Sequence, residues 1–493
     1  MSNFSFIDGS IAGLYLLVVV VIGVLVRRYV SRVDQFLLAG RELNVFLGIA
    51  SLAACEFGIV TCMYAAQNGY EKGFAGVTPG ILLALAMFVV GKTGFCIKPL
   101  RNAGVLTIPE LFEKQFGGRV RWMSGVVIVL GGLLNMGVFL RTGGDFLVTV
   151  CGINPEYLEI TMTLLLLGIG LYTVMGGMIS VLITDYLQFI VLSLGLLIVS
   201  VMIFASVGWD RLVETVWATH GAGGFNPFVN PDMGVAYVLF NAVVALAVVL
   251  TWQTMIQRVL ASKSSRAGQR IYTGTSPFFV ARFLLPALWG IAALATLPAG
   301  EVTGSTMLAM PKFLSTFVPP VVMGIVVAAM LAADMSTDAS YMLTWGGVIY
   351  NDIMRPFRKA EWPQKKGLVW NRSIVAMIGV FLLLYGLWYP LRGDLWTYLT
   401  VTGSIYLSSI SVLLIACSYW KRANNWGATS AITLGAIMPV SYLVLEQIPE
   451  TAPFARGAIG PYVWGILSYA AAAMAMVAGT LLKPGRERQG GTA

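Results

Sequence analysis

The chain has 493 residues, of which 57% are hydrophobic and only 11% are charged, and its mean hydropathy is +0.80. Water-soluble domains carry about 25% charged residues, so this composition excludes a soluble globular protein and predicts an all-α polytopic membrane protein. The net charge of +9 is spread over many loops instead of forming one patch. Attraction to anionic lipid accounts for it, so no nucleic-acid partner is expected.

Thirteen apolar segments are long enough to be transmembrane helices, because roughly 20 apolar residues cross the ~30 Å hydrocarbon layer. An odd number of spans places the two termini on opposite sides of the lipid bilayer. In chain order the expected spans cover residues 8–26, 44–68, 75–97, 122–150, 157–175, 178–207, 233–257, 272–298, 319–350, 371–390, 395–419, 425–445 and 460–482.

Lysine and arginine residues gather in alternate loops. One side has most of them, among others Arg28, Arg41, Arg101, Arg121, Arg258, Lys366, Lys421 and Lys483. The other side has only Lys72, Arg211, Lys312, Arg392 and Arg456. By the positive-inside rule the first side is cytoplasmic, which predicts a cell (inner) membrane protein with its N-terminus outside and its C-terminus inside.

Catalytic and metal-binding clusters are not evident, because the sequence has one histidine, His220, and five cysteines without paired spacing. An enzyme is therefore not expected. Charged residues lie instead inside the spans, where an ionised group costs about 2.5–3.5 kcal/mol and often marks a solute or ion path. They are Glu56, Lys92, Arg141, Asp145, Asp185, Arg282, Asp334 and Asp338. Pairing within the protein is the alternative, as for Arg141 and Asp145 at helical i, i+4 spacing.

The ninth span carries a stripe of small and hydroxyl residues. At ~100° per residue, one helical face presents Ala333, Ser336, Thr337 and Ser340. Such a face offers oxygen ligands to an alkali cation, although hydroxyl groups in membrane helices more often bond to their own helix or to a neighbouring one. Asp334 and Asp338 lie one turn apart on the adjoining face, where they would act as a polar lining, an ion pair or a titrating group.

The second span predicts an interrupted helix. Small residues surround Glu56, and Gly58 lies in the middle of the span, where a helix can break and expose carbonyl groups to a cavity. Secondary transporters build cation and solute sites from such breaks near the midplane. A close crossing of small residues is the alternative, but it leaves no room for an acid.

Three motifs resemble the sodium/solute symporter family. Its signature is similar to Gly176-Gly-Met-Ile-Ser-Val-Leu-Ile-Thr-Asp-Tyr-Leu-Gln188. Met335-Ser-Thr337, which stands fifteen residues before Asp352-Ile353, is similar to the bacterial proline-carrier branch, and Gly40-Arg41 leads into the interrupted helix. The resemblance covers residues ~8–419.

This resemblance implies a leucine-transporter-like core of two inverted repeats, residues 44–207 and 233–419, joined by an extracellular loop at 208–232. Residues 1–43 would add an N-terminal helix and a cytoplasmic loop, and residues 420–493 would add two helices and a cytoplasmic tail. The implied cofactor is Na+. By position, its ligands would be the carbonyls of Ala54, Phe57 and Ala333 and the hydroxyls of Ser336 and Thr337. Asp185 and Ser340 match a second sodium site or release path of some members, but Ala339 replaces a serine of that site.

The solute is less well defined. Glu56 would favour an ammonium-bearing molecule such as an amino acid or quaternary amine, imported together with sodium. Trp252 and Gln253 resemble the seventh span of the choline-carrier branch, and Gln67 lies near the outer end of the interrupted helix, so these residues are further candidate contacts. A sugar, carboxylate or vitamin remains an alternative, as does a channel or a solute-sensing module. No obligatory protein partner is evident.

Overall fold

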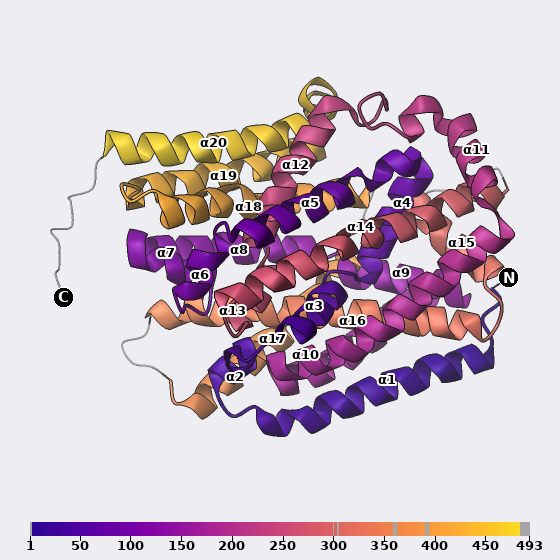
Figure 1. Ribbon diagram of the computed structural model, residues 1–493, viewed down its shortest axis with the longest axis horizontal. Coiled ribbons are helices and arrows are strands. Elements are labelled where there is room, and N and C mark those ends of the chain that lie inside the picture. The colour runs from indigo at the N-terminus through magenta and orange to yellow at the C-terminus, as the bar shows by residue number, and fades with distance from the viewer. Residues whose placement is uncertain (1, 299, 303–304, 358–361, 390–393, 484–493) are drawn as a thin grey trace.

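The computed structural model describes residues 2–298, 300–302, 305–357, 362–389 and 394–483, and within them every regular element is a helix (Figure 1). The first half of the chain contains α1 (Phe6–Val26), α2 (Val33–Leu38), α3 (Val45–Cys55), α4 (Ile59–Lys72), α5 (Thr78–Thr93), α6 (Ile97–Asn102), α7 (Ile108–Phe116), α8 (Gly118–Met136), α9 (Phe139–Cys151) and α10 (Leu158–Ser206). The second half contains α11 (Trp209–His220), α12 (Gly234–Thr251), α13 (Gln253–Ala261), α14 (Ser265–Thr296), α15 (Ala309–Phe317), α16 (Val322–Val348), α17 (Gln364–Trp388), α18 (Leu395–Tyr419), α19 (Asn425–Gln447) and α20 (Gly460–Leu482).

Eleven stretches of the described residues are helical, long and apolar enough to cross a membrane, so the expected count of thirteen is not confirmed. One difference is α10, a single element where two spans were expected, bent at Gly177 (φ 54°, ψ −151°). The other is the expected second span, which is split into α3 and α4. Its first half has only 11 residues, and its second half runs into α5 as one apolar stretch.

Two helices of the core are interrupted inside the protein. The first break lies between α3 and α4, at Glu56–Gly58, as the sequence predicted. The second lies between α12 and α13, where Trp252 has an extended backbone (φ −64°, ψ 119°), and it was not predicted. Backbone groups released at such breaks are tolerated at membrane depth only where they line a cavity or find partners in the protein.

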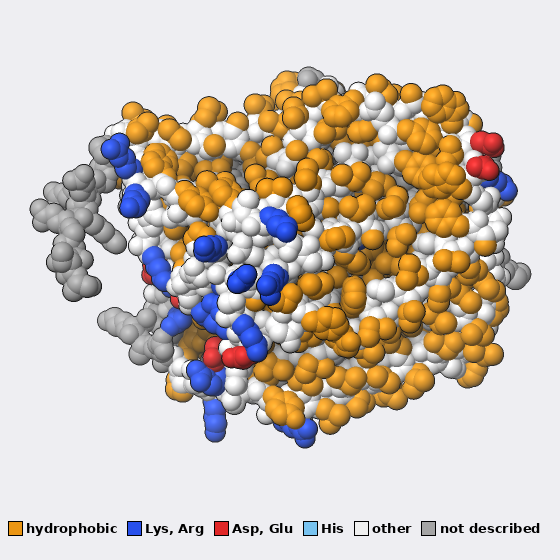
Figure 2. Space-filling view, in the orientation of Figure 1, with side chains coloured by type: hydrophobic (Ala, Val, Ile, Leu, Met, Phe, Trp, Pro, Cys, Tyr) orange, Lys and Arg blue, Asp and Glu red, His pale blue; other side chains and the backbone are white. Residues whose placement is uncertain are grey.

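The helices run mostly along the long axis of the molecule, with α1 on one edge and α19 and α20 on the opposite edge (Figure 1). Between them, α16 is buried over nearly its whole length and packs against α10, α1, α17 and α8. The chain enters α1 at the right end in this view and leaves α20 at the left end. Hydrophobic side chains cover most of the visible face, while Lys and Arg gather towards the left end (Figure 2). This is the surface expected of a protein held in lipid with its basic end in water.

Candidate functional site

Both helix breaks border an internal cavity. Its volume is about 70 Å³, and it receives side chains from α4, α5, α8, α9, α12, α13, α14, α16 and α18. Glu56 reaches it from the first break and Trp252 from the second, while Arg282 and Tyr341 line its walls. All four of these side chains are buried, so the cavity is a candidate solute site in the interior of the protein.

The predicted sodium ligands lie where α16 packs against the first break. Ala54, Phe57, Ala333, Ser336 and Thr337 are all buried. A Cβ atom added to Gly58 would stand 2.9 Å from Thr337 Oγ1, so the glycine allows the break to approach the hydroxyl face of α16. Within the described residues, Thr337 Oγ1 has no hydrogen-bond partner, although buried hydroxyl groups normally have one. Carbonyl and hydroxyl oxygens at a helix break suit a sodium ion, but the assignment of these five ligands stays a prediction.

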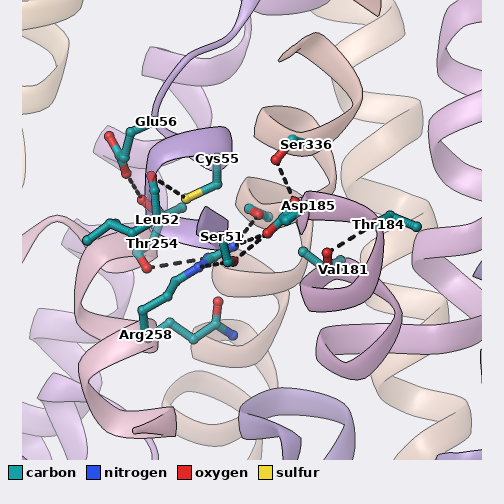
Figure 3. Close-up of polar contacts among 12 residues, drawn as sticks. Ser51, Leu52, Cys55, Glu56, Val181, Thr184, Asp185, Thr254, Arg258 and Ser336 are labelled. Atoms are coloured by element: carbon teal, nitrogen blue, oxygen red, sulfur yellow. Dashed lines mark hydrogen bonds and ion pairs between the residues drawn. The ribbon is translucent and has the colours of Figure 1, made fainter. Parts of the chain in front are cut away.

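A buried ion pair between Asp185 and Arg258 joins α3, α10, α13 and α16 (Figure 3). Asp185 Oδ1 accepts a hydrogen bond of 2.5 Å from Ser336, and its Oδ2 accepts one of 2.5 Å from Ser51. Arg258 Nη2 lies 3.1 Å from Asp185 Oδ2 and donates to Ser340 Oγ at 2.6 Å. The guanidinium therefore binds oxygens of Asp185 and Ser340, the two residues expected from the sequence at a second sodium site or release path.

The burial of Arg258 corrects its assignment to a cytoplasmic loop. Its side chain is fully buried, because α13 carries it back into the protein against Asp185. Lys72, counted as an outer-side residue, is likewise buried, and its Nζ lies 2.7 Å from Asp394 Oδ2. Counting basic residues along a sequence cannot separate a loop residue from one that is neutralised inside the fold.

Glu56 has a basic partner in the cavity wall. Its Oε2 lies 3.4 Å from Arg282 Nη1, and its Oε1 accepts a hydrogen bond of 2.5 Å from Thr254. Arg282 Nη2 also donates to Tyr64 Oη at 2.8 Å. The ammonium-bearing solute was inferred from an unpaired carboxylate, so this ion pair leaves that expectation unsupported.

Of the other predicted solute contacts, only Trp252 lines the cavity. Its Nε1 donates to Tyr341 Oη at 2.9 Å, and its ring stacks on Tyr406 at a centroid distance of 5.9 Å. Gln253 donates to the carbonyl of Thr251 and lines a separate, smaller cavity. Gln67 belongs to another polar cluster, where its Nε2 donates to Glu71 and Thr306.

Asp334 and Asp338 are buried on α16, and neither has a basic partner within the described residues. The Asp334 carboxyl group lies beside the backbone N–H of Ile59, the first residue of α4. A negative charge there is favoured by the N-terminal end of the helix. For Asp338, both of whose oxygens lack partners in the described part of the chain, the structure offers no explanation. Arg141 and Asp145 do form the i, i+4 pair, at 3.8 Å.

Comparison with known proteins gives consistent matches. The model of the sodium:solute symporter family matches residues 36–435. Sodium/glucose cotransporter 4 of Danio rerio is 25% identical over 526 residues, covering 96% of this chain and 77% of that protein. Sodium/myo-inositol cotransporter 2 of Sus scrofa is 27% identical over 496 residues, covering 90% and 70%.

Solved structures show the same fold. A Na+-coupled sialic acid symporter in a substrate-bound outward-open state has a TM-score of 0.83 at 19% identity, over 98% of each chain. MhsT in complex with L-phenylalanine has a TM-score of 0.53 at 14% identity, covering 89% of this chain and 98% of that one. The leucine-transporter-like architecture expected from the sequence is thereby confirmed.

Proposed function

Since the chain belongs to the sodium:solute symporter family, and is therefore a sodium-coupled transporter in a membrane and not an enzyme, we propose that it imports a small organic solute by alternating access. The solute occupies the cavity between the two helix breaks, and sodium binds beside it. We keep the two inverted repeats at 44–207 and 233–419, the outer N-terminus and the cytoplasmic C-terminus as parts of this proposal.

The observation that carries the sodium site is the unpartnered hydroxyl of Thr337 against Gly58. A sodium ion there would take the carbonyls of Ala54, Phe57 and Ala333 and the hydroxyls of Ser336 and Thr337. Ser336 donates its proton to Asp185, so the lone pairs of its oxygen remain available to the ion. The ion would hold the break between α3 and α4 against α16 until it leaves.

A single sodium ion per cycle is supported by Arg258. Its guanidinium binds Asp185 and Ser340, which supplies a positive charge without an ion from solution. With one sodium, each 100 mV of membrane potential would contribute about 2.3 kcal/mol per cycle for a neutral solute and nothing for a solute of charge −1.

Closure of the outer side is supported by an aromatic cluster and an ion pair. Tyr64, Phe283 and Trp396 lie within 5.4 Å of one another by ring centroids at one end of the cavity. Further along α4, Lys72 pairs with Asp394 at the start of α18. Opening of these contacts would admit solute and sodium, and their closure would precede release inwards.

The test uses the double variant Ser336→Ala, Thr337→Ala in the purified protein. Sodium, but not potassium or choline, should raise the unfolding temperature of the wild type, and the double variant should lose this response. Ser411→Ala is the matched control, because Ser411 is a buried hydroxyl that donates only to carbonyls of its own helix. A normal sodium response in the double variant would refute the ligand assignment. Sodium-driven accumulation of solute in vesicles separates a symporter from a channel, which cannot concentrate it.

A further inference from the structure

The cavity wall is mainly apolar and aromatic, and most of its polar groups already have partners. Asn135 donates to the carbonyl of Leu399, Thr61 to that of Glu56, and Thr400 to that of Trp396. A molecule rich in hydroxyl groups would therefore find few free donors and acceptors here. The wall favours a solute with an apolar or aromatic body and one polar group.

Arg282 supplies the free donor for that polar group. Its side chain is 8% exposed and lines the cavity, and its Nε has no hydrogen-bond partner in the described part of the chain. The guanidinium lies over the rings of Phe279 and Phe283, at 4.7 and 5.6 Å from their centroids, which fixes its plane. Buried N–H groups without partners are rare. The Nε atom is itself buried, so an acceptor reaches it when the cavity opens towards Arg282.

The ion pair with Glu56 does not use up the arginine. A single contact of 3.4 Å from Nη1 is longer than a typical charge-assisted hydrogen bond and is not the paired, parallel geometry that guanidinium and carboxylate prefer. Glu56 instead takes its short hydrogen bond from Thr254. Glu56 thus holds Arg282 in place and compensates its charge, while Nε keeps no partner in the described part of the chain.

We propose that the solute is an apolar or aromatic carboxylic acid in its anionic form, bound through its carboxylate to Arg282. This inference rests on the proposed function and names the substrate class of the same cavity. A guanidinium distinguishes a carboxylate from a hydroxyl or an amide by charge and by two parallel donors. An ammonium group would lack a free carboxylate partner here, because the two oxygens of Glu56 already accept hydrogen bonds from Thr254 and Arg282.

The position of Thr337 gives this solute a physical link to sodium. Thr337 lines the cavity and is also a proposed sodium ligand, so an anionic solute and the ion would bind close together. Each would lower the cost of bringing the other's charge into a low-dielectric interior. Binding of the two would therefore be mutually dependent.

Thermal stabilisation of the purified protein in sodium tests the proposal with matched pairs of ligands. The probes are hexanoate, benzoate and phenylacetate, each beside its amide, with glucose, proline and choline for comparison. At least one acid should stabilise the wild type in sodium, and its amide should not. Arg282→Met should weaken binding of that acid roughly 100-fold, as expected for loss of a charged hydrogen-bond pair.

Three further variants separate the explanations. Glu56→Gln, Arg282→Met keeps the cavity uncharged if the single arginine variant does not fold, and it should also lose the acid response. Glu56→Gln alone should bind the acid at least as tightly as the wild type, whereas an ammonium solute would be lost. Arg141→Met is the control, since Arg141 does not line the cavity and pairs with Asp145.

Each result supports or refutes either the carboxylate inference or the proposed function. Three results would overturn the carboxylate inference. The first is stabilisation by glucose, by choline or by an amide that is as strong as stabilisation by the acids. The others are no response to any acid and an unchanged acid response in Arg282→Met. A neutral solute accumulated with sodium would do the same while leaving sodium-coupled import intact. Accumulation without any need for sodium would instead refute the proposed function.

Discussion

Gly58→Ala tests the sodium site at its tightest point. The new Cβ would lie 2.9 Å from Oγ1, 3.1 Å from Cβ and 3.2 Å from Cγ2 of Thr337. Carbon atoms pack at about 3.5–4.0 Å, so the break and α16 would have to separate by about 0.4–0.9 Å. The backbone of Gly58 is extended (φ −95°, ψ 174°) and open to alanine, so the contact itself is the perturbation.

Without sodium the two elements can relax apart, but an ion bound by both requires them to close. The overpacking cost of about 1–3 kcal/mol therefore falls on the bound state and should weaken sodium binding roughly 5- to 150-fold. The measurement is the sodium concentration that gives half of the thermal stabilisation. Gly170→Ala, where a Cβ meets nothing within 4 Å, is the matched control. A sodium midpoint for Gly58→Ala equal to that of the control would refute the reasoning.

Three further changes test other contacts. Arg258→Met leaves the Asp185 carboxylate buried without its cation and should lower the unfolding free energy in SDS titration by about 3–5 kcal/mol, while added Asp185→Asn should recover most of the loss. A single-variant cost below about 1 kcal/mol would contradict this pairing. Lys72→Met should open the outer end and raise labelling of the buried Cys62 on α4 by an impermeant thiol reagent, as should Asp394→Asn, and unchanged labelling would speak against a closing role for this ion pair. Gly177→Ala should lower the unfolding temperature, because a Cβ there would stand 2.5 Å from Phe36 on a backbone with φ 54°, and an unchanged temperature would count against the strained bend.

The first helix break could be predicted from local residues, and the second could not. Gly58 and its small neighbours mark the first break, whereas the second break, at Trp252 and Gln253, has neither a glycine nor a proline. The second break is stabilised by distant partners: Tyr272 donates to the carbonyl of Val249, and Trp252 donates to Tyr341. Tertiary contacts of this kind leave no signal in a short window of sequence.

The same limit applies to the charged residues. The hydroxyl face of α16 follows from helical periodicity, so Ser336 and Thr337 could be found from spacing alone. The partners of Asp185 and Glu56 lie 73 and 226 residues away, and nothing in the spacing links them. Arg258 was therefore placed in a loop, and Glu56 was treated as an unpaired acid.

The position of Arg258 beside Asp185 also affects the largest solute concentration ratio that the transporter can maintain across the membrane. A guanidinium on a side chain cannot depart with each turnover, so it adds nothing to the driving force that an exchangeable ion would bring. Whatever the charge of the solute, every additional ion moved per turnover multiplies the attainable concentration ratio by the full electrochemical gradient of that ion. In the proposed cycle Arg258 takes the place of such an ion, so this gain is absent and the steady-state ceiling is that of single-ion coupling.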